Sequence, residues 1–306
     1  MRPKKNILII GGTGFIGYHL AKESLKKGWV VTSISTKPSK KKRYLSKVKY
    51  IFCDITNKKS LNNNIYKSFD YVVNLGGYVD HSNKKKTFES HYIGCKNLAE
   101  IFSKKKPTAF IQIGSSVEYG NIKAPQKENA KCNPKSNKSI YGKAKLLSSM
   151  YLINLYKKKK FPITILRLYL TYGPRQDINR FIPIVIESCI KNKKFDCSEG
   201  NQYRDFVHVD DVVDAILKSL INKNSRGQII NVGSGKPRKI RNIIERIKKI
   251  SKGGYPQFGK IKLRKDEILK LYPNIKKAKN KINWKPKIPF DEGLKSTIKF
   301  YNEQAK

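Results

Sequence analysis

Tyr141 and Lys145 are the two side chains in this sequence whose types and spacing most directly indicate catalysis. Residues four positions apart share one face of a helix and lie one turn from each other. An ammonium group at that distance favours the phenolate and lowers the pKa of the tyrosine, so that the phenol exchanges protons near neutral pH. Because the chain has 55 lysines, a tyrosine and a lysine at this spacing also occur by chance. The pair therefore needs support from a second segment with residues suited to catalysis.

The second segment contains two serines, Ser115 and Ser116, which follow the apolar stretch Phe110–Ile113. A strand that ends in serines presents hydroxyl groups able to hydrogen-bond a substrate oxygen beside the tyrosine. The polar, proline-containing stretch Asn121–Ser139 is expected to be a loop that brings the two segments together. These residues predict a site that polarises and protonates a substrate oxygen.

A glycine-rich segment near the start of the chain predicts a dinucleotide site. It reads GGTGFIG at residues 11–17 and lies between an apolar run, Ile7–Ile10, and an amphipathic segment, Tyr18–Lys27. A strand, a glycine turn and a helix start follow one another in this way where a pyrophosphate binds at the helix N-terminus. The residues expected to contact the cofactor here are Gly11, Gly14, Phe15, Ile16 and Gly17.

Short apolar segments alternate with helical patterns through the first half of the chain, which is typical of a parallel, doubly wound sheet. We therefore expect an α/β fold with a doubly wound parallel Rossmann sheet and a smaller C-terminal substrate-binding lobe. The expected strands are Ile7–Ile10, Val30–Ile34, Lys49–Phe52, Tyr71–Leu75, Phe110–Ile113 and Ile163–Leu168. The expected helices are Tyr18–Lys27, Phe88–Phe102, Tyr141–Lys157, Phe181–Lys191, Val212–Leu220 and Ile240–Ser251, before a proline-containing tail around Trp284.

The length of 306 residues and the hydrophobic content of 39% suit one large α/β domain with a smaller lobe. The dinucleotide-binding domain is expected to comprise residues 1–168 together with about 205–232, and the substrate lobe residues 169–204 and 233–306.

The formal net charge of +44 is the most unusual feature of the composition. Its 55 lysines and 11 arginines are spread along the whole chain, whereas a nucleic-acid site more often clusters arginine and interleaves aromatic residues. We therefore expect solvated basic faces and no specific nucleic-acid partner. A milder consequence is attraction of small anionic substrates.

The cysteines and the hydropathy of the sequence together predict the cellular compartment of the protein. The five cysteines are dispersed without metal-ligand spacing, which predicts reduced thiols and no metal site. No apolar stretch is long enough for a membrane span, and the first one is too short for a signal peptide. The sequence thus predicts a cytoplasmic protein without a membrane partner.

Motifs along nearly the whole chain resemble the extended short-chain dehydrogenases/reductases of the NAD(P)-dependent sugar-nucleotide epimerase/dehydratase group. Besides the glycine turn and Tyr141 with Lys145, the matching motifs are Asp54-Ile55, NLGG at 74–77, SSVEYG at 115–120, YGPR at 172–175, YRDFVHVDDVV at 203–213, NVGSG at 231–235 and WKP at 284–286. The resemblance implies an oxidoreductase that binds a nucleotide-diphosphate sugar and forms a homodimer.

The resemblance also implies roles for individual residues. Ser115 and Tyr141 would bind the sugar oxygen, Tyr141 would act as acid and base, and Lys145 would hold the nicotinamide ribose. Further cofactor contacts would come from Asp54, Ile55, Leu75, Gly76 and Gly77. Further substrate contacts would come from Ser116, Arg204 and Arg264, the arginines binding the diphosphate.

Three departures from the family pattern refine the expectation. NAD-preferring members carry an acidic residue at the end of the second strand, whereas this chain has Ser35, Thr36 and Lys37, followed by the basic run 40–43. The missing carboxylate predicts that NADP(H) is preferred, with NAD(H) possible. Ser115 is not followed by the Asp-Glu pair of dehydratases, and Leu170 stands where many members have asparagine.

Within the family, the C-terminal half looks most like the 4-ketoreductase branch typified by CDP-abequose synthase. This resemblance implies NADPH-dependent reduction of the C4 carbonyl of a 4-keto-6-deoxy nucleotide sugar in deoxysugar, polysaccharide or lipopolysaccharide biosynthesis. The alternatives are an NAD-dependent nucleotide-sugar 4-epimerase and, in another class, a non-catalytic dinucleotide sensor or polyanion-binding protein. The sequence leaves the base, the sugar and the stereochemistry at C4 open.

Overall fold

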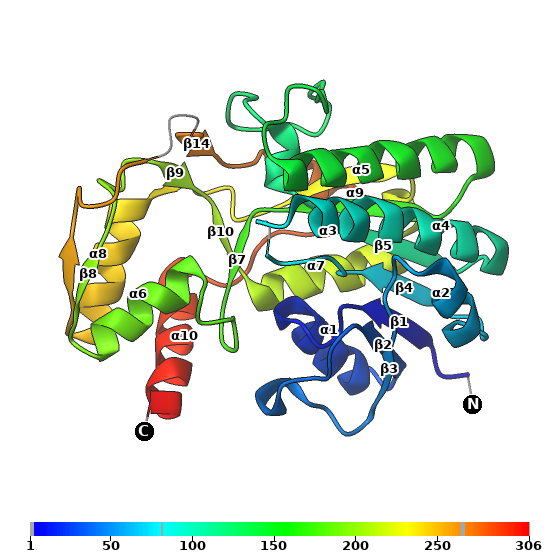
Figure 1. Ribbon diagram of the computed structural model, residues 1–306, viewed down its shortest axis with the longest axis horizontal. Coiled ribbons are helices and arrows are strands. Elements are labelled where there is room, and N and C mark those ends of the chain that lie inside the picture. Colours follow the sequence, from blue (N-terminus) through cyan, green and yellow to red (C-terminus); the bar gives the residue numbers. More distant parts are fainter. Residues whose placement is uncertain (1–2, 81, 264–266, 306) are drawn as a thin grey trace.

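A seven-stranded sheet, parallel in every pairing, organises the larger part of the protein (Figure 1). The computed structural model describes residues 3–80, 82–263 and 267–305. The strand order is β11-β6-β5-β4-β1-β2-β3, which confirms the doubly wound Rossmann sheet. Its strands are β1 (Asn6–Ile10), β2 (Val30–Ser35), β3 (Val48–Phe52), β4 (Tyr71–Asn74), β5 (Ala109–Ser115), β6 (Ile163–Leu168) and β11 (Gln228–Val232).

The strand order places a crevice at the carboxyl end of β1. Ile10, the last residue of β1, is in register with Ile34 of β2 on one side and with Asn74 of β4 on the other. The chain passes from β1 to β2 and β3 on one side and returns to β4 on the other side, so the strand order reverses at β1. Ligands of open α/β sheets bind at such a point. All six predicted strands are found, with ends that differ by at most two residues.

Helices cover both faces of the sheet (Figure 1). One face packs against α1 and α7, and the other against α2, α4 and α5. These helices, with the neighbouring α3 and α9, are α1 (Phe15–Lys26), α2 (Lys58–Asn64), α3 (Lys84–Phe88), α4 (Gly94–Lys105), α5 (Ile140–Lys159), α7 (Val209–Ile221) and α9 (Lys276–Ile282). The helix predicted over Phe88–Phe102 is interrupted by a π turn, η2 (Glu89–Ile93). Within the described residues, no helix is long and apolar enough to cross a membrane.

The smaller lobe is built from three helices and several short strand pairs. The sequence pattern predicted a proline-containing tail around Trp284 and no helix after it, but the structure has a long final helix whose Leu294 and Ile298 pack into the core of this lobe. The elements are α6 (Phe181–Ile190), α8 (Ile240–Ser251) and α10 (Phe290–Ala305), with β7 (Leu170–Tyr172), β8 (Lys194–Asp196), β9 (Tyr203–Arg204), β10 (Phe206–His208), β12 (Arg238–Lys239), β13 (Tyr255–Gln257) and β14 (Lys270–Leu271).

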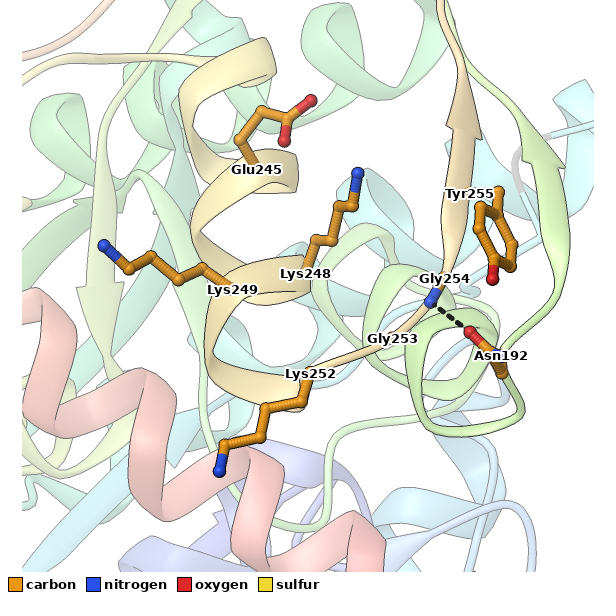
Figure 2. A pocket seen from close by; sticks show the side chains of 8 residues that line it. All are labelled: Asn192, Glu245, Lys248, Lys249, Lys252, Gly253, Gly254 and Tyr255. Atoms are coloured by element: carbon orange, nitrogen blue, oxygen red, sulfur yellow. Dashed lines mark hydrogen bonds between the residues drawn. The ribbon is translucent and has the colours of Figure 1, made fainter.

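A pocket of about 440 Å³ lies where α8 ends and β13 begins. Figure 2 shows Lys248 and Lys249 on the last turn of α8 and Lys252 directly after it, with Tyr255 on the neighbouring strand β13. The backbone N–H of Gly254 donates to Asn192 Oδ1 at 3.0 Å and closes one side. This pocket belongs to the small lobe, and none of the described residues predicted for the site lines it.

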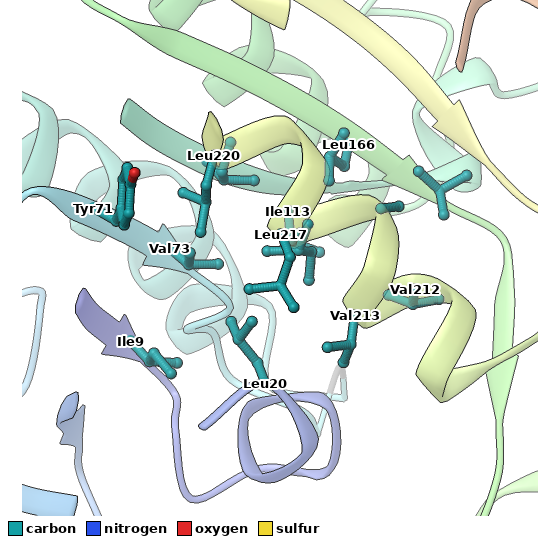
Figure 3. Close-up of a cluster of buried hydrophobic side chains, with 14 of the residues drawn as sticks. Ile9, Leu20, Tyr71, Val73, Ile113, Leu166, Val212, Val213, Leu217 and Leu220 are labelled. Atoms are coloured by element: carbon teal, nitrogen blue, oxygen red, sulfur yellow. The ribbon is translucent and has the colours of Figure 1, made fainter. Parts of the chain in front are cut away.

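The main apolar core fills the space between the sheet and helices α1 and α7. Figure 3 shows Leu20 of α1 and Leu217 of α7 among strand residues such as Ile9, Val73 and Ile113. Each of these aliphatic side chains contributes about 1.5–3 kcal/mol when it is fully removed from water. The same packing fixes α1 against β1, and therefore the turn between them that forms the predicted cofactor site.

Candidate active site

The glycine turn between β1 and α1 has the shape that a pyrophosphate needs. Gly11 adopts a φ of +80°, which favours glycine, and its N–H donates to Ile34 O at 2.7 Å. A Cβ at Gly17 would lie 2.3 Å from Gly11 O, so the close approach of helix and turn requires glycine there. Among the described residues no side chain caps α1 at Gly14, which leaves its first N–H groups for an anion.

The other predicted cofactor residues lie at the carboxyl ends of β2, β3 and β4. Ser35 Oγ accepts from Thr13 N at 3.4 Å, which brings the end of β2 to the glycine turn. Thr36 and Lys37 follow on the surface. Asp54 accepts from the N–H and hydroxyl of Thr56 at 2.8 and 2.9 Å, and this shapes the turn after β3.

The turn after β4 closes the crevice on its other side. Leu75 N donates to Ile10 O at 2.9 Å, and Gly76 N donates to Asn74 Oδ1 at 3.0 Å. A Cβ on Gly76 would lie 2.6 Å from Ile10 Cγ2, and one on Gly77 would overlap the ring of His91. Gly76 therefore lets the chain approach β1 closely, and Gly77 lets it approach His91, so no side chain of the turn fills the crevice. The residues fit a dinucleotide, with Gly11, Gly14, Gly17, Gly76 and Gly77 forming the cradle.

Helix α5 places the predicted catalytic pair at its start. Ser139 caps the helix by accepting from Gly142 N at 3.3 Å, so Tyr141 and Lys145 fall in its first two turns. Lys145 Nζ donates to Ile113 O of β5 at 2.7 Å and lies 6.0 Å from the centre of the Tyr141 ring. Ser115, the last residue of β5, is hydrogen-bonded to Tyr141. The structure thus brings these three predicted catalytic residues together.

Burial governs the protonation of this pair. It raises the pKa of Tyr141, and the hydrogen bond from Ser115 opposes it only in part. Burial likewise lowers the pKa of Lys145 to about 8, although the carboxylate of Glu118 opposes this shift. The expectation that Tyr141 has a lowered pKa is therefore wrong, because desolvation of the phenol has the largest effect and raises the pKa.

Glu118 holds the end of β5 in place. Its Oε1 accepts from Ser115 N at 2.8 Å, while its Oε2 accepts from Ser149 Oγ at 2.7 Å and from Arg167 Nε at 2.9 Å. Both members of the Glu118–Arg167 pair are buried. A carboxylate engaged in this way is structural, and it fixes the backbone that carries Ser115.

Ser116 and His91 both lie next to the cluster of Ser115, Tyr141 and Lys145. Ser116 opens the short helix η3 (Ser116–Tyr119) and is buried, and its substrate contact stays a prediction. His91 was missed by the sequence analysis: its ring packs edge-on at 4.8 Å from that of Tyr141, and its Nε2 lies 3.1 Å from Tyr78 O. A lone histidine in a helix gives no signal of this contact in the sequence.

A second pocket, of about 460 Å³, lies in the small lobe and contains Arg204. Its walls are largely apolar, with Phe181, Phe195 and Ile240 among them, and Leu170 lies at its edge with 40% of its surface exposed. The Arg204 guanidinium forms an ion pair with Glu267. Arg264, the other predicted diphosphate ligand, lies outside the described residues.

The basic run after β2 is partly engaged by the loop after β7. Lys40 Nζ and Arg43 Nη2 both lie 3.1 Å from Asp177 Oδ1, and Arg43 Nε donates to Arg175 O at 3.1 Å. Arg43 is only 3% exposed, so it serves as an internal contact. Lys37 and Lys41 remain exposed at this edge.

Comparison with known proteins agrees with this geometry. A model described as the NAD dependent epimerase/dehydratase family matches residues 7–233. A putative UDP-glucose 4-epimerase of Methanocaldococcus jannaschii is 30% identical over 95% of this chain and 97% of its own. A UDP-N-acetyl-α-D-glucosaminuronate decarboxylase of Bacillus cytotoxicus is 27% identical over 98% of both chains.

A solved structure adds a comparison of the whole fold. It is a UDP-glucuronic acid 4-epimerase from Bacillus cereus, a tyrosine-to-phenylalanine mutant in complex with UDP-4-deoxy-4-fluoro-glucuronic acid and NAD. It superposes with a TM-score of 0.88 and 25% identity, covering 98% of this chain and 100% of that one. The family match runs from β1 through the glycine turn and the Ser115, Tyr141 and Lys145 cluster to Gly233, and the chain therefore belongs to the NAD-dependent epimerase/dehydratase family.

Proposed function

We propose that this protein is an NAD-dependent 4-epimerase of a UDP-linked sugar. The observation that carries the proposal is the meeting of Ser115, Tyr141 and Lys145 beside the glycine cradle. That arrangement suits proton transfer at the oxygen of a carbon that loses hydride on oxidation and regains it on reduction. The similarity to a putative UDP-glucose 4-epimerase and to a 4-epimerase solved in complex with NAD and a UDP-sugar derivative favours epimerisation over a single reduction.

The roles of the three residues follow from their positions. A bound nicotinamide supplies the acceptor and donor of hydride. Tyr141 takes the proton of the sugar hydroxyl as its carbon is oxidised and returns a proton when that carbon is reduced from the other face. Ser115 donates a hydrogen bond to the same oxygen. Lys145, whose Nζ lies 6.0 Å from the centre of the Tyr141 ring, supplies a positive charge that stabilises the phenolate.

The small lobe provides the features that a nucleotide diphosphate requires. Arg204 offers a planar guanidinium to the phosphates, in competition with Glu267. The apolar walls of the 460 Å³ pocket suit packing against a base. Leu170 stands where many family members have asparagine. The part of the substrate that contacts Leu170 in this pocket is therefore expected to be less polar than in those relatives.

NADPH-dependent reduction of a 4-keto-6-deoxy nucleotide sugar is the second candidate. It is favoured by one specific observation, the absence of an acidic residue at Ser35 and Thr36, because a carboxylate there repels a 2′-phosphate. A 4,6-dehydratase is less well supported. Ser116 and Val117 occupy the positions of its acid and base, and Glu118 is held by Arg167.

The deciding experiment compares the wild-type protein with Tyr141→Phe. Without added cofactor, the wild type is expected to interconvert the C4 epimers of a UDP-hexose or UDP-hexuronic acid, as measured by chromatography. Loss of the phenolic proton carrier lowers this rate at least about 100-fold. Tyr156→Phe, on the far half of α5, is the matched control and keeps the rate.

The outcomes separate the candidates. Consumption of NADPH with a 4-keto-6-deoxy nucleotide sugar and no epimerisation would establish the reductase instead. Equal rates in wild type and Tyr141→Phe would exclude both enzymes as described. Release of the bound dinucleotide by denaturation, followed by mass spectrometry, identifies NAD or NADP directly.

A further inference from the structure

The loop that follows β2 combines two features that favour opposite cofactors. Ser35 and Thr36 offer no carboxylate to the adenosine ribose, and Lys37 and Lys40 stand next to them in the sequence. By itself this pattern favours a 2′-phosphate, because cations attract it and nothing repels it. A negative charge nevertheless reaches the loop from a distant segment, at Asp177.

Asp177 lies in the loop 173–177 between β7 and α6, and its carboxylate is shared by two cations of the basic run. Its Oδ1 lies 3.1 Å from Lys40 Nζ and 3.1 Å from Arg43 Nη2. Burial raises the pKa of Asp177, but Arg43 and Lys40 more than offset this and hold it below its usual value. The group is therefore fully ionised at neutral pH.

Several contacts hold this carboxylate near the cofactor end of the sheet. The Arg175 guanidinium lies 5.0 Å from the ring centre of Tyr18, in the first turn of α1, and also donates to Lys42 O. His19 Nε2 lies 3.0 Å from Pro174 O. Arg175 itself has a φ of +70°, a strained value for a non-glycine residue that the surrounding contacts must hold. The loop 173–177 is thus tied to α1 and to the chain after β2 together.

We propose that Asp177 supplies the negative charge that the end of β2 lacks, and so biases the dinucleotide site toward NAD over NADP. The carboxylate pairs with Lys40, an exposed cation that would otherwise attract a 2′-phosphate, and its own negative charge repels that phosphate. Lys37 and Lys41 keep the region positive, so the effect is a bias between two cofactors that both bind. This inference rests on the proposed function only in requiring a dinucleotide site.

The test measures dissociation constants for NADH and NADPH by titration of the protein freed of bound nucleotide. Wild type is expected to bind NADH more tightly. Asp177→Asn is expected to shift the ratio of the two constants about tenfold toward NADPH, as one charge facing a phosphate predicts. Because both constants come from one preparation, any unfolded fraction cancels from their ratio.

Three further variants isolate the cause. Asp177→Glu keeps the charge and is expected to leave the ratio within about twofold of wild type. Asp70→Asn removes a carboxylate that pairs with Lys5 at 3.0 Å at the opposite end of the strands, and it is expected to leave the ratio unchanged. Lys40→Ala, at an exposed position, is expected to shift the ratio toward NADH.

A ratio unaffected by Asp177→Asn, or a wild type that prefers NADPH, would overturn the inference. Failure of the protein to bind either dinucleotide would instead overturn the proposed function, since the binding assay needs no substrate. The two failures are therefore distinct.

Discussion

Lys145 is charged at neutral pH although its side chain is almost completely buried. Only 4% of the residue is exposed, and its Nζ donates to the Ile113 carbonyl at 2.7 Å. Burial lowers its pKa from 10.5 to about 8, while the attraction of Glu118 opposes the shift. The proposed roles of Lys145, which are to bind a cofactor ribose and to assist Tyr141, both use this charge.

The pKa of Lys145 makes a prediction about stability. Between pH 8 and 10.5 the unfolded chain holds a proton at this residue that the folded protein has lost. The free energy of unfolding contributed by Lys145 therefore rises with pH across this window. Below pH 8 both states are protonated and the burial penalty is complete.

Comparison with Lys145→Met measures this contribution, because methionine keeps most of the volume and has no charge. Urea unfolding at pH 7.5 and pH 10 is expected to show that any stability advantage of the variant shrinks as the pH rises. Other titrating groups are common to both proteins and cancel. A difference that stays constant between the two pH values would show that Lys145 does not titrate there.

The sequence predicted that Tyr141 and Lys145 lie together, but not how they are protonated. Spacing alone places Tyr141 and Lys145 on one helix face, and this was sufficient to select them. Their pKa values depend on how closely α5 packs on β5, and on Glu118, which reaches Lys145 through the fold. No local pattern contains that information, so the direction of the Tyr141 shift was predicted wrongly.

At the scale of elements, the buried Glu118–Arg167 pair joins the end of β5 to β6. Arg167→Met is expected to destabilise the protein by about 3–5 kcal/mol, because it leaves the Glu118 carboxylate buried without its cation. Urea unfolding measures the loss. Glu118→Gln is the companion variant, and it is expected to keep measurable turnover since the carboxylate is structural.

Two results would contradict this interpretation. Loss of turnover in folded Glu118→Gln comparable with that of Tyr141→Phe would give the carboxylate a chemical role. Unchanged stability in Arg167→Met would show that water or Ser149 compensates for the lost guanidinium. A double-mutant cycle on Glu118 and Arg167 then separates their interaction energy from the loss of unfolding free energy caused by each single substitution.

Elements with a strong period were predicted well, and those fixed by tertiary contacts were not. Helix α8 was predicted with its exact ends, because isoleucines recur at helical spacing. The final helix was not predicted, since Leu294 and Ile298 reveal its buried face only through their packing in the core of the small lobe. The loop 121–139 was predicted as a connection. The sequence did not predict the hydrogen bonds by which Gln126 joins this loop to Tyr272 and Tyr169.

The whole molecule is strongly basic, and the structure assigns part of that charge to internal contacts. Arg43 and Arg167 are each about 97% buried and paired with carboxylates. Most of the lysines remain on the surface, as the even spread in the sequence predicted. The surface thus produces a positive field that any anionic substrate meets before it reaches the pocket.

This field predicts a dependence of catalysis on ionic strength. A nucleotide diphosphate-sugar is anionic, and the net charge of +44 attracts it over a distance that falls from about 30 Å at 0.01 M salt to about 8 Å at 0.15 M. We expect kcat/KM to fall several-fold as potassium chloride rises from about 10 to 300 mM, while kcat changes little. The field acts on encounter and binding, whereas the enclosed Tyr141 is screened much less.

Steady-state rates in chloride and in sulfate at equal ionic strength distinguish screening from occupation of a site. Equal decreases in the two salts indicate the general field of the lysines. A larger decrease in sulfate indicates an anion that competes at Arg204, where two N–H groups can bind one oxyanion. If kcat/KM were independent of both salts, the surface charge would have no part in substrate capture, and local contacts in the 460 Å³ pocket would have to supply all of the affinity.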